Sequence, residues 1–594
     1  MDAQTKKKFT IWQWRTIFVT MIGYALFYFV RKNFSFAMPG LAAEYGISNT
    51  SFGALITIVG LVYGFSRYFN GILADRMNAR YHMSFGLFCC AAISIAFGFI
   101  PKILGVEIGT TSQILKILGV EIGTASQILI VVFGILLVLI NIFQGSGFPP
   151  CARLLAHWIP PQELATKQSI WNTSHSIGAF VLALFCGFIM SNMGSDVSNN
   201  PQTVENITYN YVTTLFKDDV KKSDDNIAKV IKDTCSFNDG TTRHKIEGLY
   251  SIEQIEGGYE VAVRYTLKNN PTDTLVKTCA FSKENFLAVK AVADKAEAEG
   301  KEIKASEIAT QCGIDKAQAK ATQVIVARTE HSGAWKYSFW LPGIIALIGA
   351  LGLFLLLRDT PKSVGLPELE SAKTSIDDEE QVDAASRKAF VKKMVYKNPI
   401  IWGLAFANFF VYVVRFSVLD WGPKFLTEAC NMSYEKAGIT VAAFEIMAIV
   451  GTLFAGWATD KFFGGRAHRT CLWCMVGAGA AMGVFYTFYL NPGVAPDWAL
   501  IAVLAMAGFF VYGPQALIGI AAANHATKKA AATANGLVGI FGYLSTAVSG
   551  LGIGWLADHL GWNYVFIGVI AMAVVGMVVF LLMWRARRDG YDKA

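Results

Sequence analysis

The chain has 594 residues, of which 53% are hydrophobic and only 16% charged, and this composition is too apolar for a soluble protein of that length. Its formal charge of +8 comes mostly from basic residues beside apolar segments, so it gives no support to nucleic-acid binding. No metal-ligand cluster, phosphate-binding loop or nucleophile–base set is recognisable, so we predict neither an enzyme nor a cofactor.

Apolar segments long enough to cross a bilayer recur through both halves of the chain. A helix of about 20 residues spans a hydrocarbon core of about 30 Å. We therefore predict an all-α polytopic membrane protein with about twelve transmembrane helices in two six-helix bundles. The predicted helices cover residues 12–31, 52–73, 82–101, 129–150, 168–191, 337–357, 399–420, 436–458, 470–490, 498–523, 532–556 and 563–584.

Charge beside these segments predicts the orientation. The first segment is full-length, lacks a small-residue cleavage site and follows three lysines at positions 6–8, so we expect a retained signal anchor. Basic residues favour the cytoplasmic side, and they follow the second, eighth and twelfth helices. They are Arg76, Arg80, Lys461, Arg466, Arg469, Arg585, Arg587 and Arg588. We expect a multi-pass protein of the bacterial inner (cytoplasmic) membrane with both termini in the cytoplasm.

The remaining segments define the domain organisation. Residues 192–335 are polar and predict a small extracytoplasmic α+β insertion, and residues 359–398 are a charged cytoplasmic linker. The bundles then comprise residues 1–191, with a tandem duplication over 102–129, residues 336–358 as helix 6, and residues 399–594 as helices 7–12.

The insertion has its own pattern. Residues 246–267 alternate polar and apolar side chains and predict a β-hairpin, whereas residues 283–329 are rich in Ala, Lys and Glu and predict helix. Cys235, Cys279 and Cys312 lie on the oxidising side, where two of them can form a disulfide, with the pairing left open. The sequence identifies no partner for this insertion.

An internal repeat relates the two halves. Tyr28-Phe29-Val30-Arg31 reappears as Tyr412-Val413-Val414-Arg415, and Pro39 and Pro423 follow the two arginines at the same spacing. Downstream, Gly71-Ile72-Leu73-Ala74-Asp75-Arg76 is echoed by Gly456-Trp457-Ala458-Thr459-Asp460-Lys461. Such repeats relate two bundles by an axis along the membrane normal, with the substrate at mid-membrane between them.

Arg31 and Arg415 are the leading site candidates. A charge within the membrane costs several kcal/mol and is normally kept for a function or neutralised by a partner. Both lie near the ends of their predicted helices, so snorkelling to the interface is the alternative. Their equivalent positions favour an anionic substrate, because guanidinium groups match phosphate or carboxylate oxygens.

Other candidates surround the arginines. Lys32 adjoins Arg31, although helical spacing turns it away and favours the interface, and Arg67 is either a third substrate cation or an interface anchor. His175 either packs in its helix or binds phosphate and adjusts to its protonation. Neutral hydrogen bonds and stacking would come from Tyr63, Trp171, Asn172, Tyr412, Asn535 and Tyr543.

Charged residues at cytoplasmic helix ends have a different predicted role. Asp75 with Arg76, and Asp460 with Lys461, are expected to latch neighbouring helices in one conformation rather than contact substrate.

Several motifs together resemble the organophosphate:phosphate antiporters of the major facilitator superfamily. The resemblance covers all the predicted helices and rests on GxLADRxNxR at 71–80, YFVRKNFSFAMP at 28–39, FQGSGFPPCARLL at 143–155, WNTSHSIG at 171–178, YVVRFSVLDWGP at 412–423 and GPQALIGIAA at 513–522. It implies a phosphate clamp on Arg31 and Arg415, assisted by His175. The turn Asp420-Trp421-Gly422 and the sequence around residues 521–544 resemble most the hexose-phosphate sensor and transporter branch. Arg67, where many members have lysine, and the two insertions depart from the family.

The resulting function hypothesis is uptake of a sugar phosphate, hexose 6-phosphate or glycerol 3-phosphate, in exchange for inorganic phosphate. A transporter-like sensor that signals external hexose phosphate to a kinase is the first alternative. A proton-coupled organic anion symporter is the second, with Glu445 as the titrating group; the same residue could simply balance a cation. The sequence leaves the organic part of the substrate and the oligomeric state open.

Overall fold

The computed structural model describes residues 3–45, 47–104, 125–193, 244–255, 258–267, 270–282, 305–313, 333–367, 389–430, 432–491 and 495–587, with a few residues between 288 and 295. Most of the duplicated segment and of the charged linker, together with Cys235, lies outside the described residues.

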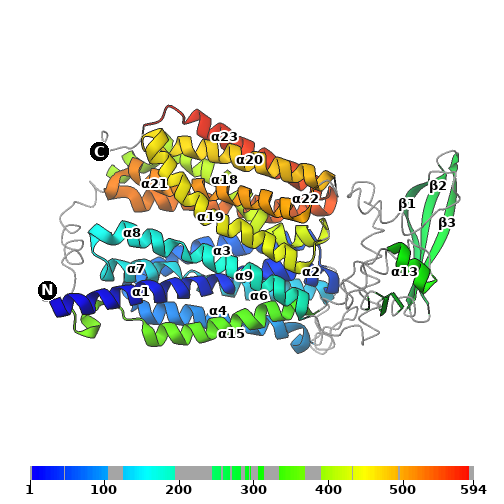
Figure 1. Cartoon of the computed structure of the whole chain (residues 1–594), viewed down its shortest axis with the longest axis horizontal. Coiled ribbons are helices and arrows are strands. Elements are labelled where there is room, and N and C mark those ends of the chain that lie inside the picture. The colour runs from blue at the N-terminus through cyan, green and yellow to red at the C-terminus, as the bar shows by residue number, and fades with distance from the viewer. Residues whose placement is uncertain are drawn as a thin grey trace.

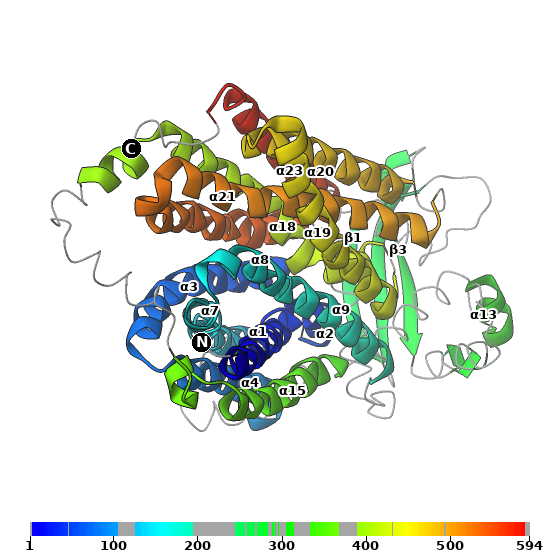
Figure 2. The same ribbon diagram turned by 60° about the vertical axis from the view of Figure 1, so that its left-hand side comes forward.

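Helices of the first half of the chain form one side of the molecule. In chain order they are α1 (Ala3–Phe29), α2 (Asn33–Tyr45), α3 (Asn49–Arg76), α4 (Ala79–Leu104), α6 (Ala125–Gln144), α7 (Phe148–Trp158), α8 (Pro161–Asn172), α9 (Ser174–Asn192) and α15 (Ala334–Leu356). Figure 2 shows that α15, which follows the insertion in sequence, packs against α4 and so returns to this half.

The second half contributes the other group of helices. They are α18 (Pro399–Glu428), α19 (Tyr434–Phe463), α20 (Ala467–Leu490), α21 (Asp497–Leu544), α22 (Ile553–His559) and α23 (Trp562–Leu582). Short segments η3 (Pro361–Val364), η4 (Lys392–Tyr396) and η5 (Ala547–Gly552) connect or extend them. The helix α23 ends at the end of the molecule where α1 begins (Figure 1).

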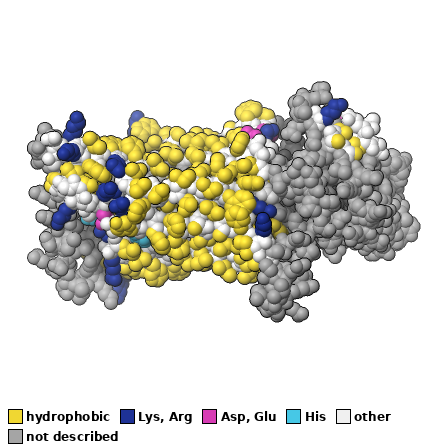
Figure 3. All heavy atoms as spheres, turned by 90° about the horizontal axis from the view of Figure 1, so that it is seen from below, with side chains coloured by type: hydrophobic (Ala, Val, Ile, Leu, Met, Phe, Trp, Pro, Cys, Tyr) yellow, Lys and Arg dark blue, Asp and Glu magenta, His cyan; other side chains and the backbone are white. Residues whose placement is uncertain are grey.

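Eleven helices in the described part of the chain are long and apolar enough to cross a membrane. They correspond to all the predicted helices except the first, which lies in α1 together with Lys6–Lys8, Gln13 and Arg15. Hydrophobic side chains cover the middle of the face seen in Figure 3, and basic side chains gather toward its ends, chiefly where α1 begins. Phe65, Ile348 and Leu453 are more than 60% exposed, as side chains that face lipid would be.

Several predicted helices are interrupted near one of their predicted ends. Residues 30–32 form a turn between α1 and α2, Gly145-Ser146-Gly147 separates α6 from α7, and Thr173 separates α8 from α9. The reverse occurs in α21, where two predicted helices are joined across a single non-helical residue, Thr527, with φ of 61°. Broken helices place backbone polar groups in the interior, which is tolerated where a cavity or neighbouring helices satisfy them.

The two halves pack closely at one end. Helix α9 lies against α19, and α3 lies against η5 and α22. A Cβ atom on Gly187 would lie 3.0 Å from the Cα of Gly438, so α9 and α19 touch backbone to backbone. Small residues permit such close approach between membrane helices.

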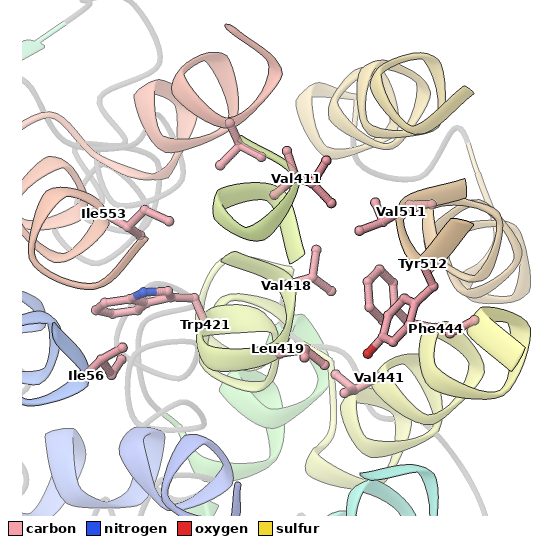
Figure 4. Close-up of a cluster of buried hydrophobic side chains, with 14 of the residues drawn as sticks. Ile56, Val411, Val418, Leu419, Trp421, Val441, Phe444, Val511, Tyr512 and Ile553 are labelled. Carbon is pink, nitrogen blue, oxygen red and sulfur yellow. The ribbon is translucent and has the colours of Figure 1, made fainter. Parts of the chain in front are cut away.

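The core around α18 ties both halves together. The Trp421 indole is 2% exposed and donates a hydrogen bond to the Ser549 carbonyl at 2.7 Å. Its ring lies between Ile56 of α3 and Ile553 of α22 (Figure 4). This packing fixes the part of α18 that follows Arg415.

The insertion contains a three-stranded antiparallel sheet in the order β1 (His244–Ile255), β2 (Gly258–Leu267) and β3 (Asn270–Ser282). The predicted hairpin is confirmed by the pairing of β1 with β2, which closes at Ile255 and Gly258. β3 was not predicted, because its polar sequence lacks regular alternation. The helix α13 (Ala305–Cys312) falls in the predicted helical segment and ends with Cys312, which carries a free thiol. The sheet lies beyond the end of the bundle opposite the start of α1 (Figure 1).

Candidate functional site

Arg31 is positioned by the break between α1 and α2. The backbone N–H groups of Arg31 and Lys32 both donate to the Tyr28 carbonyl at 3.2 Å, which closes the turn. The half-buried guanidinium lies 3.7 Å from the centre of the Tyr63 ring and 5.7 Å from that of Tyr28. Tyrosine rings stabilise a cation through their negative faces without neutralising its charge.

Arg415 occupies the corresponding place in the second half, within the continuous helix α18. It is 5% exposed, and its guanidinium lies 4.6 Å from the Tyr512 ring centre and 5.7 Å from those of Tyr412 and Phe416. Its Nε is buried and has no hydrogen-bond partner. An orphaned buried donor on a guanidinium is suited to an anion.

Arg67 adds a third cation from α3. Its guanidinium lies 4.4 Å from the Phe148 ring centre, and Nη1 makes a long hydrogen bond of 3.5 Å to the Tyr543 hydroxyl. Tyr543 also contacts the rings of Tyr63 and Tyr412. Within the described part of the chain, Arg31, Arg67 and Arg415 form no ion pair with a carboxylate.

Lys32 differs from the arginines because it has a counter-ion. Its ammonium pairs with the carboxylate of Asp420, from the opposite half. Both residues line a cavity together with Arg31 and Tyr543. Lys32 thus reaches the inter-bundle cavity rather than the lipid interface.

His175 lies in the first turn of α9. Its Nδ1 lies 2.5 Å from the Asn172 carbonyl, so Nδ1 carries the proton, while Nε2 is buried without a partner. The imidazole lies 5.9 Å from the Tyr28 ring and 6.4 Å from the Tyr512 ring, centre to centre. The free nitrogen is available to a ligand between these rings.

Glu445 is connected to Arg415 through Tyr512. The Tyr512 hydroxyl donates to the Glu445 carboxylate, and the face of the same ring lies against the Arg415 guanidinium. Glu445 is 1% exposed, so its charge acts on the site without contact with water.

The neutral candidates are not equally placed. Tyr63 and Tyr412 contact Arg31 and Arg415 respectively, as described above. Trp171 is 1% exposed in the core of the first half, where its indole N–H donates to Thr20 Oγ1 at 3.1 Å. The Asn172 side chain is exposed. The burial of Trp171 favours packing over substrate contact.

The predicted latch residues lie in the last turns of α3 and α19. Arg76, Asp460 and Lys461 are exposed, and Lys461 lies over Trp457 and Phe462 of its own helix. None of these three forms an ion pair with the opposite half among the described residues. The predicted latch role stays a prediction.

Sequence reasoning did not assign roles at the site to Asp420 and Tyr512. Asp420 lies within the YVVRFSVLDWGP motif, and Tyr512 adjoins the GPQALIGIAA segment. A buried carboxylate one or two turns beyond Arg415 was a usable signal for Asp420. Nothing in one sequence marks Tyr512 among its 21 tyrosines.

A helical membrane bundle with a cavity between its halves, lined by Arg31 and by the Lys32–Asp420 pair, has the arrangement of a solute transport protein. The Major Facilitator Superfamily profile matches residues 20–199, 325–464 and 421–594, and the chain belongs to this family of transporters.

Relatives and one solved structure agree with this assignment. The chain is 29% identical to the glycerol-3-phosphate transporter of Bacillus subtilis, over 95% of this chain and 90% of the relative. It is 27% identical to a probable hexose phosphate transport protein of Chlamydia pneumoniae (98% and 93%) and 25% identical to the membrane sensor protein UhpC of Escherichia coli (97% and 92%). The crystal structure of a bacterial homologue of the human lysosomal transporter Spinster superposes with a TM-score of 0.59 at 13% identity, covering 97% of each chain, which supports the fold.

Proposed function

We propose that this protein takes up a sugar phosphate, hexose 6-phosphate or glycerol 3-phosphate, in exchange for inorganic phosphate. One observation carries the proposal. Arg31 and Arg415, one from each half, rest on tyrosine rings instead of carboxylates, and Arg415 keeps an unpaired Nε–H. Relatives named as transporters of glycerol 3-phosphate and hexose phosphate support the same substrate class.

Exchange follows from the charge of the empty site. Moving unpaired guanidinium groups through an occluded, poorly solvated state costs several kcal/mol. A phosphate dianion bound between Arg31 and Arg415, with Arg67 and His175 nearby, offsets this charge and lets the halves rock around it. The empty protein therefore crosses slowly, and each phosphate that leaves is replaced by another.

The topology belongs to the same proposal. The helix α1 supplies the twelfth membrane span, and its apolar second half ends at Phe29, just before the site. Two six-helix bundles then comprise residues 1–191 with 336–358, and residues 399–594, joined by the linker 359–398. The protein lies in a bacterial inner membrane with both termini on the cytoplasmic side, because basic residues gather at the end of the bundle where the termini lie (Figure 3). Residues 192–335 form an extracytoplasmic α+β domain.

A sensor is the second candidate, because the relatives include a membrane sensor protein whose similarity extends over 97% of this chain and 92% of the relative. A sensor would bind hexose phosphate through the same residues, Arg31, Arg67, His175 and Arg415, while transporting little of it. Uptake by the wild-type protein separates the two functions.

The proposal is tested in proteoliposomes loaded with phosphate, by measuring exchange of labelled external phosphate. Wild type should exchange, and unlabelled sugar phosphates should compete; the panel of competitors identifies the organic part. Arg31→Lys and Arg415→Lys should each reduce exchange by about tenfold or more, because lysine lacks the planar fork of donors.

Arg469→Lys is the matched control. Arg469 stacks on Trp584 at 4.6 Å and donates to its carbonyl at 3.1 Å, away from the site, so this variant should behave as wild type. Near wild-type exchange in both site variants would exclude the clamp.

A further inference from the structure

Asp558 of the second half caps a helix of the first half. Its carboxylate accepts hydrogen bonds from the backbone N–H groups of Asn49 at 3.1 Å and Thr50 at 2.7 Å, and from the Thr50 hydroxyl at 2.6 Å. Asn49 and Thr50 are the first residues of α3, and Asp558 lies in the last turn of α22. A carboxylate at a helix N-terminus is favoured by both the free N–H groups and the helix dipole.

This contact is part of a close seam between α3 and the segment η5–α22. A Cβ atom on Gly53 would lie 2.4 Å from the Gly550 carbonyl oxygen, and one on Gly554 would lie 2.3 Å from that of Asn49. The Thr57 hydroxyl donates to the Thr546 carbonyl at 2.8 Å and accepts from the Leu551 N–H at 2.9 Å. Backbones this close leave no passage between α3 and the segment η5–α22.

The other end of α3 differs. Polar contacts between α3 and the second half run from Asn49 to Arg67 among the described residues, and Arg76, the last residue of α3, is exposed. The seam therefore joins the two halves at the end opposite the start of α1 and does not continue to the end where α1 begins.

The sequence around Asp558 repeats a motif found elsewhere in the chain. Gly554-Trp555-Leu556-Ala557-Asp558 matches Gly71-Ile72-Leu73-Ala74-Asp75 at the last turn of α3. The two aspartates end helices that run in opposite directions, so the motif occurs at both ends of the bundle.

We propose that Asp558 is a positioning residue of the transport cycle, which latches the extracytoplasmic end shut by capping α3 across the bundle interface. The inference rests on the alternating access of the proposed function. The latch can open without unravelling α3, because Ser48 of the first half also caps this helix by accepting from the Ser51 N–H at 3.2 Å. Loss of Asp558 therefore shifts the protein toward the outward-open state and leaves the helix folded.

The test measures how readily the extracytoplasmic end opens. Ile56→Cys places a reporter thiol at a side chain that is 8% exposed and packed against Trp421 in the closed seam (Figure 4). Cys235, Cys279 and Cys312 are replaced by serine, and intact cells are labelled from outside with a membrane-impermeant maleimide. The same protein without Ile56→Cys gives the background.

Asp558→Ala should raise the labelling rate by roughly three- to tenfold, the effect of losing one strong helix cap. Asp558→Asn should raise it less, because an amide oxygen can still accept from an N–H. Asp497→Asn is the control: Asp497 pairs with Lys436 at 2.6 Å within the second half, and labelling should not change.

Unchanged labelling in both Asp558 variants, or an equal rise in Asp497→Asn, would overturn the latch. So would a fall in thermal stability of Asp558→Ala without faster labelling, since this is the behaviour of a purely structural cap. The readout needs no transport. If phosphate is not the substrate, added phosphate leaves labelling unaltered while the effect of Asp558→Ala persists.

Discussion

The ammonium of Lys32 and the carboxylate of Asp420 form an ion pair between the two halves of the chain. Lys32 adjoins Arg31, and Asp420 lies five residues after Arg415 in α18. Their side chains are only 16% and 8% exposed. The pair therefore joins the two bundles close to Arg31 and Arg415 in sequence, but the Asp420 carboxylate forms an ion pair with neither arginine.

Asp420→Asn should be strongly disruptive, because it leaves the Lys32 ammonium buried without its partner. Breaking a buried pair from one side costs about 3 kcal/mol or more. We expect a clear fall in the thermal unfolding temperature in detergent, and at least about tenfold slower phosphate exchange.

A double variant provides the control for this pair. Lys32→Gln with Asp420→Asn removes both charges and should recover part of the stability lost in either single variant, as expected for coupled residues. Additive losses would show that the two side chains act independently.

Arg67→Lys tests the third cation. Lysine keeps the charge but cannot stack its head group flat on Phe148 or direct a fork of donors toward Tyr543. We expect KM for phosphate to rise by about three- to tenfold with little change in kcat, and Arg67→Ala to be worse. Equal exchange kinetics in all three proteins would assign Arg67 to packing.

The sequence predicted eleven of the membrane-spanning helices, because long apolar segments are a local signal. It also marked Arg31 and Arg415 as site candidates, because each is a costly charge within a repeated motif, and their joint role stays a prediction. It did not predict that Arg31 lies in a turn after α1 while Arg415 lies within a helix, since the two motifs are nearly identical. The backbone break depends on what packs around it.

Contacts across the bundle interface were the least predictable part. The sequence favours the lipid interface for Lys32, whereas the structure pairs it with Asp420 in the cavity that Arg31 also lines. Lys32 and Asp420 are 388 positions apart, and one sequence contains no signal that joins them. Trp171 shows a second limit of the sequence, which suggested a substrate contact for a residue that is buried in the core. The local sequence around an aromatic residue is the same whether its side chain lines a cavity or fills a core.

Trp171→Phe should therefore affect stability more than binding. The change removes the hydrogen bond to Thr20 and part of a buried side chain, which together cost about 2 kcal/mol. Thermal unfolding should report this loss, while the Kd for phosphate, measured by calorimetry, should stay within about twofold of wild type. A large rise in the Kd for phosphate without loss of stability would instead show that Trp171 contributes to substrate binding.

Glu445→Gln separates exchange from proton coupling. In a symporter that uses Glu445 as its proton carrier, glutamine cannot take up a proton, so uptake driven by a proton gradient should be abolished. In an exchanger Glu445 only affects the electrostatic field at Arg415 through Tyr512. A glutamine at position 445 can still accept the hydrogen bond from the Tyr512 hydroxyl. We expect exchange to fall by about two- to tenfold in Glu445→Gln, with no response to a proton gradient in wild type or in this variant.

Tyr512→Phe is the companion variant, because it keeps the ring against Arg415 and removes the hydroxyl. A similar modest loss in both variants would place Glu445 and Tyr512 in one supporting contact, whereas abolition of uptake by Glu445→Gln alone would favour the symporter.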